Sequence, residues 1–331
     1  MNISVIGAGS MGIAVAVLLS SKGYNIKIWS AFKDEVEMLN IHKEHKTKLP
    51  GVYISENVVA STDMEFVLHN ADMAVIALPS QTIRAVLRMM RNMMKNNTIL
   101  VCCSKGIEQE TNLLLSDVIK QEISNNCIVV ALSGPSHAEE IGRFVPTAVV
   151  AACEEIKYAE IVQDVFMTST FRVYTNIDIV GVELGGALKN VIALCAGISD
   201  GLGFGDNTKA ALMTRGMVEI ARLGAAMGAK PETFAGLTGI GDLIVTCTSM
   251  HSRNRRAGIL IGQGKSVKDA LDQVKMVVEG YSTTKPAYEL SKLKNVPMPI
   301  TTEAYNILYE GKDAKQAVTD LMTRDKKYEI W

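Results

Sequence analysis

The sequence predicts an α/β fold, in which an N-terminal doubly wound sheet is followed by a C-terminal all-helical domain. Three observations predict it. The chain has 331 residues, enough for two domains. Short apolar strand-like runs alternate with helical patterns through the first half, which is typical of a mostly parallel sheet covered by helices. From about Ile179 the strand-like runs stop and long helical patterns follow. We therefore expect one domain over residues 1–178 and a second over residues 179–331.

A glycine-rich turn lies at the start of the first domain. Gly7-Ala8-Gly9-Ser10-Met11-Gly12 follows an apolar strand over Ile3–Ile6 and opens a helical pattern over Ile13–Leu19. In this spacing the first glycine turns the chain, the second lets the backbone approach a pyrophosphate, and the third lets helix pack on strand. A glycine-rich turn without a ligand is the alternative. The strand, turn and helix order, with a further strand at Asn25–Trp29, favours a Rossmann-type dinucleotide-binding domain.

The remaining elements follow in order. Further strands are expected at Met73–Leu78, Thr98–Cys103, Cys127–Leu132 and Thr147–Ala151, with helices that include Thr82–Met94 and Asn112–Glu122. Second-domain helices are expected at Val180–Ala196, Asn207–Met227, Ser266–Val274, Tyr281–Leu293 and Thr301–Tyr309. Ligands bind beyond the carboxyl ends of strands in such sheets. The candidate segments there are Pro79-Ser80-Gln81, Ser104-Lys105-Gly106 and residues 133–138. Turn formation explains their glycines and prolines, but it does not explain Lys105.

Composition excludes several classes of protein. The formal net charge is -1 and 48% of residues are hydrophobic, so nothing attracts the chain generally to nucleic acid or anionic membrane. No apolar run reaches transmembrane length, and the N-terminus lacks a basic signal-peptide region. The six cysteines form no CxxC pair, which is typical of reduced thiols in a cytoplasmic protein. His42 and His45 lack further ligands, so we expect a solvated charged loop over His42–Lys48 and no metal.

Lys189 has a setting that is unusual for a lysine. On a helix its neighbours three and four residues away are small or apolar, namely Gly185, Gly186, Ile192 and Ala193. Burying an unpaired ammonium is costly, so the side chain either reaches water over an apolar surface or faces a ligand in space that the glycines clear. Desolvation lowers a lysine pKa towards the range of an acid–base catalyst. With the glycine-rich turn in the same chain, we favour the second interpretation.

Two polar segments follow in the second domain. Gly239-Ile240-Gly241-Asp242 presents a carboxylate that could orient a lysine or a substrate hydroxyl, or merely cap the helix ahead of Leu243. Ser252-Arg253-Asn254-Arg255-Arg256 is rich in cationic and amide donors. Such a run is usually solvated surface, but arginine with asparagine and serine also suits a phosphate. No second basic patch or aromatic platform accompanies it, which argues against nucleic acid.

These motifs occur together over nearly the whole chain: Gly7–Gly12, Ser104-Lys105-Gly106, Ser133-Gly134-Pro135-Ser136, Gly185–Asn190, Gly239–Asp242, Ser252–Arg256 and Val278-Glu279-Gly280. In this order the sequence resembles the NAD(P)-dependent sn-glycerol-3-phosphate dehydrogenases of the bacterial type. The resemblance implies an oxidoreductase that interconverts sn-glycerol 3-phosphate and dihydroxyacetone phosphate. Hydride transfer would use NAD or NADP (NADH or NADPH), and the product would supply phospholipid synthesis.

The resemblance also implies residue roles. Lys189 matches the catalytic proton donor or acceptor. Cofactor-binding positions comprise the glycines of the turn and residues that match the family: Gly7, Gly9, Ser10, Met11, Gly12, Lys105, Ala138, Arg253, Val277 and Glu279. Substrate-binding positions are matched by Lys105, Gly134, Ser136, Lys189, Asp242, Ser252, Arg253 and Asn254. The partner would be a small-molecule substrate, with no nucleic acid and no integral membrane segment, and a homodimer is left open.

Two departures from the family pattern concern the cofactor. Ala31 stands where the family often has an arginine, and no Asp or Glu ends that strand to hold a ribose 2′-hydroxyl. Lys48 stands where an aromatic residue is usual. The sequence therefore does not choose between NAD and NADP, and Lys33 is a candidate contact for a 2′-phosphate.

Two other functions are considered. A related two-domain NAD(P)-dependent dehydrogenase acting on another anionic hydroxy compound would share the glycine-rich turn and the helical lysine, but would not predict the cluster at Ser252–Arg256. A non-catalytic nicotinamide redox sensor would keep the turn and have no need of Lys189, Asp242 and Arg253 together.

Overall fold

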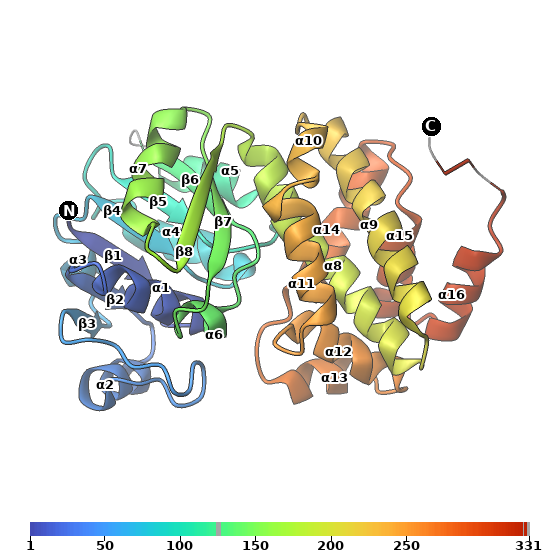
Figure 1. The fold of residues 1–331 in the computed structure, drawn as a ribbon, viewed down its shortest axis with the longest axis horizontal. Coiled ribbons are helices and arrows are strands. Elements are labelled where there is room, and N and C mark those ends of the chain that lie inside the picture. The colour runs from blue at the N-terminus through green and yellow to red at the C-terminus, as the bar shows by residue number, and fades with distance from the viewer. Residues whose placement is uncertain (124–126, 327, 330–331) are drawn as a thin grey trace.

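The computed structural model describes residues 1–123, 127–326 and 328–329. Figure 1 shows a sheet-containing N-terminal region beside a purely helical C-terminal region. The expected fold class is confirmed. The last strand ends at Asn176, and the first long helix of the second region begins at Ile179.

The N-terminal region is built on one eight-stranded sheet, in the order β3-β2-β1-β4-β5-β6-β7-β8. Every neighbouring pair is parallel except β6 and β7, which are antiparallel. The strands are β1 Ile3–Ile6, β2 Ile26–Trp29, β3 Val58–Ser61, β4 Met73–Ile76, β5 Ile99–Cys102, β6 Ile128–Ser133, β7 Thr147–Ala152 and β8 Phe171–Asn176. The order reverses between β1 and β4, which places a switch point where such sheets bind ligands.

Two strands of this sheet were not expected from the sequence. They are β3 and β8, and they form its two edges. Along β8 buried and exposed residues alternate at its start, so it lacks the continuous apolar run of a central parallel strand. The central strands β1, β4 and β5 are buried along their whole length. Their continuous apolar sequences therefore allowed these strands to be predicted.

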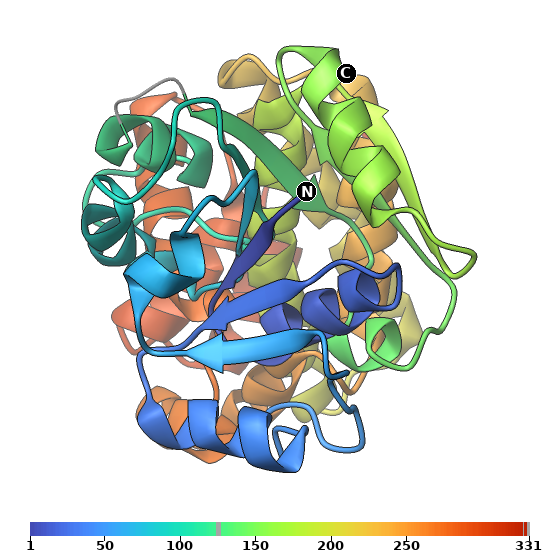
Figure 2. The same ribbon diagram turned by 90° about the vertical axis from the view of Figure 1, so that its left-hand side faces the viewer.

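Helices cover both faces of the sheet, as Figure 2 shows from the side of the N-terminal region. One buried cluster joins the sheet to α1 Ser10–Ser20, α6 Ala138–Ile141 and α7 Ile156–Phe166. The other joins it to α3 Met64–Leu68, α4 Ile83–Met90 and α5 Leu115–Glu122. The second cluster also includes Ile179 and Val182, so the first long helix of the C-terminal region packs directly on the sheet region.

That helix, α8 Ile179–Gly201, is the centre of the C-terminal region. Around it lie α9 Asp206–Ala226, α10 Pro231–Phe234, α11 Asp242–Thr248, α12 Arg253–Gly262, α13 Val267–Val274, α14 Glu279–Leu293, α15 Pro299–Tyr309 and α16 Ala314–Met322. By length and composition α8 could cross a membrane, so the expectation that no apolar segment has that length was wrong. In its most apolar window 89% of the residues are buried inside the protein, as in the core helix of a globular domain.

Glycines bring α12 into backbone contact with α8. A Cβ added at Gly197 would lie 2.1 Å from the carbonyl oxygen of Arg255, and one added at Gly258 would lie 2.1 Å from that of Leu194. Gly201 and Gly262 are equally crowded by the opposite helix. The two helices therefore pack without intervening side chains, which places the start of α12 beside the middle of α8.

Candidate active site

A buried carboxylate joins two lysines where the two regions meet. Lys189, on α8, donates from Nζ to Oδ1 of Asp242 at 2.7 Å, and Lys105, which follows β5, donates to Oδ2 of the same residue at 2.7 Å. Asp242 is 1% exposed and Lys189 is 6% exposed. The expectation that Asp242 could orient a lysine is confirmed, and the interpretation of Lys189 as a surface side chain is wrong.

The two lysines differ in how many of their N–H groups have a hydrogen-bond partner. Lys105 Nζ also donates to the carbonyl oxygen of Gly134 at 2.8 Å and to Ser136 Oγ at 3.1 Å, so its three N–H groups all have partners. Lys189 Nζ has a second partner in Thr246 Oγ1 at 2.7 Å, so its ammonium form keeps one N–H for a ligand. Lys189 is thus the lysine that is free to give up or take a proton.

Burial shapes the charge of this cluster. Burial lowers the pKa of Lys189 and the positive charge of Lys105 adds to this effect, so that the pKa is about 8 despite the opposing effect of Asp242. Burial also disfavours ionisation of Asp242, but Lys105 and Lys189 outweigh it and hold the pKa of Asp242 below its usual value. The arrangement provides a fixed carboxylate and a lysine that titrates near neutral pH, which suits acid–base chemistry.

The glycine-rich turn has the geometry that its sequence predicts. Gly7 has a φ of +115°, and a Cβ there would lie 2.6 Å from the carbonyl oxygen of Ala77. A Cβ at Gly12 would lie 1.9 Å from the carbonyl oxygen of Gly7. Gly9 differs, because its added Cβ would meet no atom closer than 3.9 Å. Packing requires the first and third glycines, whereas the open space at Gly9 fits the close approach of a pyrophosphate.

The start of α1 is able to receive that pyrophosphate. Gly9 precedes the helix, and no side chain caps its first turn. The Ser10 hydroxyl points elsewhere, donating to the carbonyl oxygen of Lys48 at 2.6 Å. The N–H groups at this end of the helix, with the positive end of the helix dipole, form an anion site that fits a dinucleotide.

Two arginines near the start of α12, Arg253 and Arg256, have no hydrogen-bond or ion-pair partner among the described residues, and Arg256 Nε is buried. The Arg253 guanidinium makes no hydrogen bond or ion pair with any residue that the structure describes. Burial lowers its pKa, while Glu279 and Glu139 act in the opposite direction at longer range. Arg255, two residues on, differs, because it is paired with Asp200 at 2.8 Å. Arg253 and Arg256 are therefore the cations of this run that are not committed to a protein partner, and Arg253 is the one that begins the helix.

Ser252 caps the start of α12, and Asn254 joins α12 to two other helices of the C-terminal region, α8 and α14. Ser252 Oγ accepts a hydrogen bond from the N–H of Arg255. Asn254 Nδ2 donates to Asn190 Oδ1 at 2.8 Å, and its Oδ1 accepts from the N–H of Gly280 at 2.8 Å. Asn254 therefore keeps one N–H and Ser252 keeps its hydroxyl hydrogen for a ligand.

The remaining predicted contacts lie around this site. Glu279 begins α14 and accepts two hydrogen bonds from Ser80, in the segment that follows β4. Ala138 begins α6, directly after the loop that carries Gly134 and Ser136, and is buried. Val277 is 44% exposed on the segment that leads into α14.

A carboxylate lies near the end of β2, although the sequence places no acidic residue there. No acidic residue follows the strand directly, but Glu35 on α2 Lys33–His42 folds back and accepts from Ser30 Oγ at 2.6 Å. Lys48 pairs with the same carboxylate, and His45 lies 3.6 Å from it. The expectation of a solvated loop was wrong for His45, which is 2% exposed. Among the described residues no three His, Cys, Asp or Glu side chains come together to hold a metal.

Three side chains at this site were missed. Thr246 lies one turn after Asp242 on α11, and the four-residue spacing was the signal that could have found it. His137 belongs to the loop after β6, and its Nε2 is buried without a hydrogen-bond partner among the described residues. Ser80 stood in a candidate segment, but its partner lies 199 residues away in the sequence.

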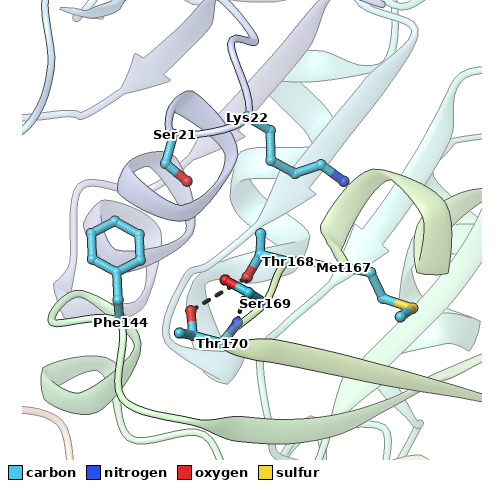
Figure 3. A pocket seen from close by; sticks show the side chains of 7 residues that line it. All are labelled: Ser21, Lys22, Phe144, Met167, Thr168, Ser169 and Thr170. Atoms are coloured by element: carbon cyan, nitrogen blue, oxygen red, sulfur yellow. Dashed lines mark hydrogen bonds between the residues drawn. The ribbon is translucent and has the colours of Figure 1, made fainter.

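A hollow of about 390 Å³ lies elsewhere, against α1 and the turn before β8 (Figure 3). Hydroxyl groups of Ser21, Thr168 and Thr170 line it together with Phe144. None of the residues predicted for the site lines it, so it is separate from the cluster around Asp242.

Comparisons with known proteins agree with this arrangement. The family described as NAD-dependent glycerol-3-phosphate dehydrogenase matches the chain twice, its N-terminus at residues 2–159 and its C-terminus at residues 178–319. The chain belongs to this family. It is 54% identical over 330 residues to a glycerol-3-phosphate dehydrogenase [NAD(P)+] from Thermoanaerobacter sp., covering 100% of this chain and 99% of the relative.

Two further relatives extend the match. The glycerol-3-phosphate dehydrogenase [NAD(P)+] of Clostridium acetobutylicum is 53% identical over 330 residues, covering 100% of this chain and 99% of that protein. A crystal structure of glycerol-3-phosphate dehydrogenase from Coxiella burnetii has a TM-score of 0.94 at 35% identity, covering 98% of this chain and 99% of the other. The likeness therefore extends over both regions of the fold.

Proposed function

We propose that this protein interconverts sn-glycerol 3-phosphate and dihydroxyacetone phosphate, using NAD(H) or NADP(H). The observation that carries the proposal is the buried Lys189–Asp242–Lys105 cluster, with one free Lys189 N–H, beside the unpartnered Arg253. A ketone that carries a phosphate needs both groups, because one end accepts a proton and the other end is anionic. Family membership supports the same substrate.

Lys189 is the proposed catalytic acid and base. The bound nicotinamide supplies or accepts the hydride at carbon 2. During reduction the carbonyl oxygen gains negative charge, which the Lys189 ammonium stabilises and then protonates. During oxidation neutral Lys189 takes the hydroxyl proton. Asp242 keeps Lys189 in place and holds Lys105 on the opposite side of the same carboxylate.

Arg253 is the proposed anchor of the substrate phosphate. A guanidinium forms two parallel charge-assisted hydrogen bonds with phosphate oxygens. The remaining donors of Ser252 and Asn254 lie on the same helix start. Binding energy at this unreactive end positions carbon 2 for the reaction.

The other assignments follow from this scheme. Residues 1–178 would form the dinucleotide-binding domain and residues 179–331 the helical substrate and catalytic domain. The cofactor would contact Gly7, Gly9, Ser10, Met11, Gly12, Lys105, Ala138, Arg253, Val277 and Glu279. The substrate would contact Lys105, Gly134, Ser136, Lys189, Asp242, Ser252, Arg253 and Asn254. We also infer a cytoplasmic protein that supplies glycerol 3-phosphate for phospholipid synthesis.

A turnover assay tests the proposal. Purified protein should oxidise NADH or NADPH in the presence of dihydroxyacetone phosphate, and much more slowly with phosphate-free dihydroxyacetone. Turnover of another anionic hydroxy compound in preference would support the related dehydrogenase instead. Cofactor binding with no turnover of either ketone would support a redox sensor.

A further inference from the structure

Arg253 and Glu279 carry opposite charges on adjacent chain segments, yet they form no ion pair. Each precedes one member of a hydrogen-bonded pair, since the N–H of Gly280 donates to Asn254 Oδ1 at 2.8 Å. Among the surrounding charges, Glu279 most strongly favours the ionised form of Arg253. Two such groups at the edge of a buried site would be expected to pair. Something therefore keeps the carboxylate away from the guanidinium.

Ser80 engages both oxygens of that carboxylate. Its N–H donates to Glu279 Oε1 at 2.9 Å, and its Oγ donates to Oε2 at 2.5 Å. Gln81 Nε2 donates to Ser80 Oγ at 3.0 Å, so the single hydroxyl hydrogen of Ser80 is directed at Glu279. Ser80 is 2% exposed, and a Cβ added at the neighbouring Gly106 would lie 2.5 Å from its Cβ. The serine is thus rigidly placed.

We propose that Ser80 is a positioning residue for substrate binding: by holding the Glu279 carboxylate in the N-terminal region, it keeps Arg253 unpaired for the substrate phosphate. The inference rests on the proposed function, and it adds a residue that touches neither substrate nor reacting atoms. It assigns to the contact between the segment that follows β4 and the start of α14 a part in phosphate recognition.

Without Ser80 Oγ, the Glu279 carboxylate would compete with the substrate phosphate for Arg253. The carboxylate has three donors, because Ser282 Oγ also donates to Oε2 at 3.3 Å. Without Ser80 Oγ, Oε2 keeps only that long bond, and the carboxylate moves towards Arg253, whose ionised form it already favours. The substrate phosphate must then displace it. Ser80→Ala should therefore lower kcat/KM for dihydroxyacetone phosphate about tenfold, mainly through KM, the loss expected for one charged hydrogen bond.

The chain offers a matched control. Ser116 holds Glu183 by the same two bonds, from its N–H at 2.9 Å and from its Oγ at 2.5 Å. Ser116 is 3% exposed, and this pair also joins the sheet region to a C-terminal helix. No part of the proposed phosphate site adjoins it. Ser116→Ala should lower stability as Ser80→Ala does, with KM for dihydroxyacetone phosphate unchanged.

A double-mutant cycle tests the proposal at saturating NADH. We expect Ser80→Ala to raise KM in the parent and to change it by less than about twofold when Glu279→Gln is already present, because a neutral amide cannot capture Arg253. Turnover of phosphate-free dihydroxyacetone should change by less than about twofold between parent and Ser80→Ala. An equal KM increase in both backgrounds, or an equal loss on both ketones, would overturn the proposal.

A second variant and the activity of the parent protein separate the possible outcomes of this test. If Ser80→Ala does not fold, Ser80→Cys, with similar volume and a weak donor, carries the same expectations. If the parent itself does not reduce dihydroxyacetone phosphate, the proposed function fails. A parent that does reduce it, with no coupling between Ser80 and Glu279, rejects the inference alone.

Discussion

The glycine-rich turn and the Asp242 cluster both prepare the protein for an anionic ligand, but they are built in opposite ways. The turn uses backbone N–H groups within six consecutive residues. The cluster uses side chains from four separate places, and Lys105 and Asp242 lie 137 residues apart in the sequence. Local geometry fixes the first site, whereas only the packed fold assembles the second. Substitutions should therefore act differently in the two places.

The largest effect is expected at Lys189. Lys189→Ala should reduce turnover about 10²–10⁴-fold, the usual contribution of a positioned acid or base. Cofactor affinity, measured by NADH fluorescence titration, should stay near that of the parent, because the turn is untouched. Lys120→Ala, which removes a lysine paired with Glu154 on the sheet region, is the control and should remain active. Turnover of Lys189→Ala within a few-fold of the parent would remove this residue from the mechanism.

The next largest effect is expected at Arg253. Arg253→Ala should lower kcat/KM for dihydroxyacetone phosphate by about 10–100-fold, the value of a charged hydrogen bond, with little further loss on phosphate-free dihydroxyacetone. Arg253→Lys should recover only part of it, since a point charge lacks the two-pronged geometry. Arg255→Ala is the matched control, because that arginine is committed to Asp200. Equal losses on both ketones would show that Arg253 does not bind the phosphate.

Two alanine substitutions sharpen the comparison within the turn. Gly9→Ala should fold normally but weaken cofactor binding by about tenfold, since its methyl group would occupy the space left for the pyrophosphate. Gly12→Ala should lower the free energy of unfolding by about 1–3 kcal/mol or more, because the methyl group would collide with the Gly7 carbonyl. Denaturant unfolding and cofactor titration separate the two outcomes. Parent-like cofactor affinity in Gly9→Ala would count against the pyrophosphate site.

The same contrast explains what the sequence could predict. The turn, the buried central strands and the change to helices at Ile179 depend on neighbouring residues, so pattern and spacing revealed them. The edge strands β3 and β8 lacked such a pattern. Lys189 was recognisable because a lysine between glycines and apolar residues is unusual. Asp242 was expected to be able to orient a lysine, but its bridging of two lysines and the bond from Lys189 to Thr246 were not predicted, because both depend on how α11 packs against α8.

The pH dependence of both reaction directions tests the central claim, that Lys189 exchanges the proton. Reduction requires the ammonium, so kcat/KM for dihydroxyacetone phosphate should be level below the pKa of about 8 and fall tenfold per pH unit above it. Oxidation requires the neutral amine, so kcat/KM for glycerol 3-phosphate should rise up to the same pH and then level. The substrate phosphate titrates near pH 6, outside this window. In Asp242→Asn both breaks should move to lower pH, because Asp242 raises the pKa of Lys189. The account would be contradicted if kcat/KM changed with pH in the same direction for reduction and oxidation, or if neither pH profile showed a break near pH 8.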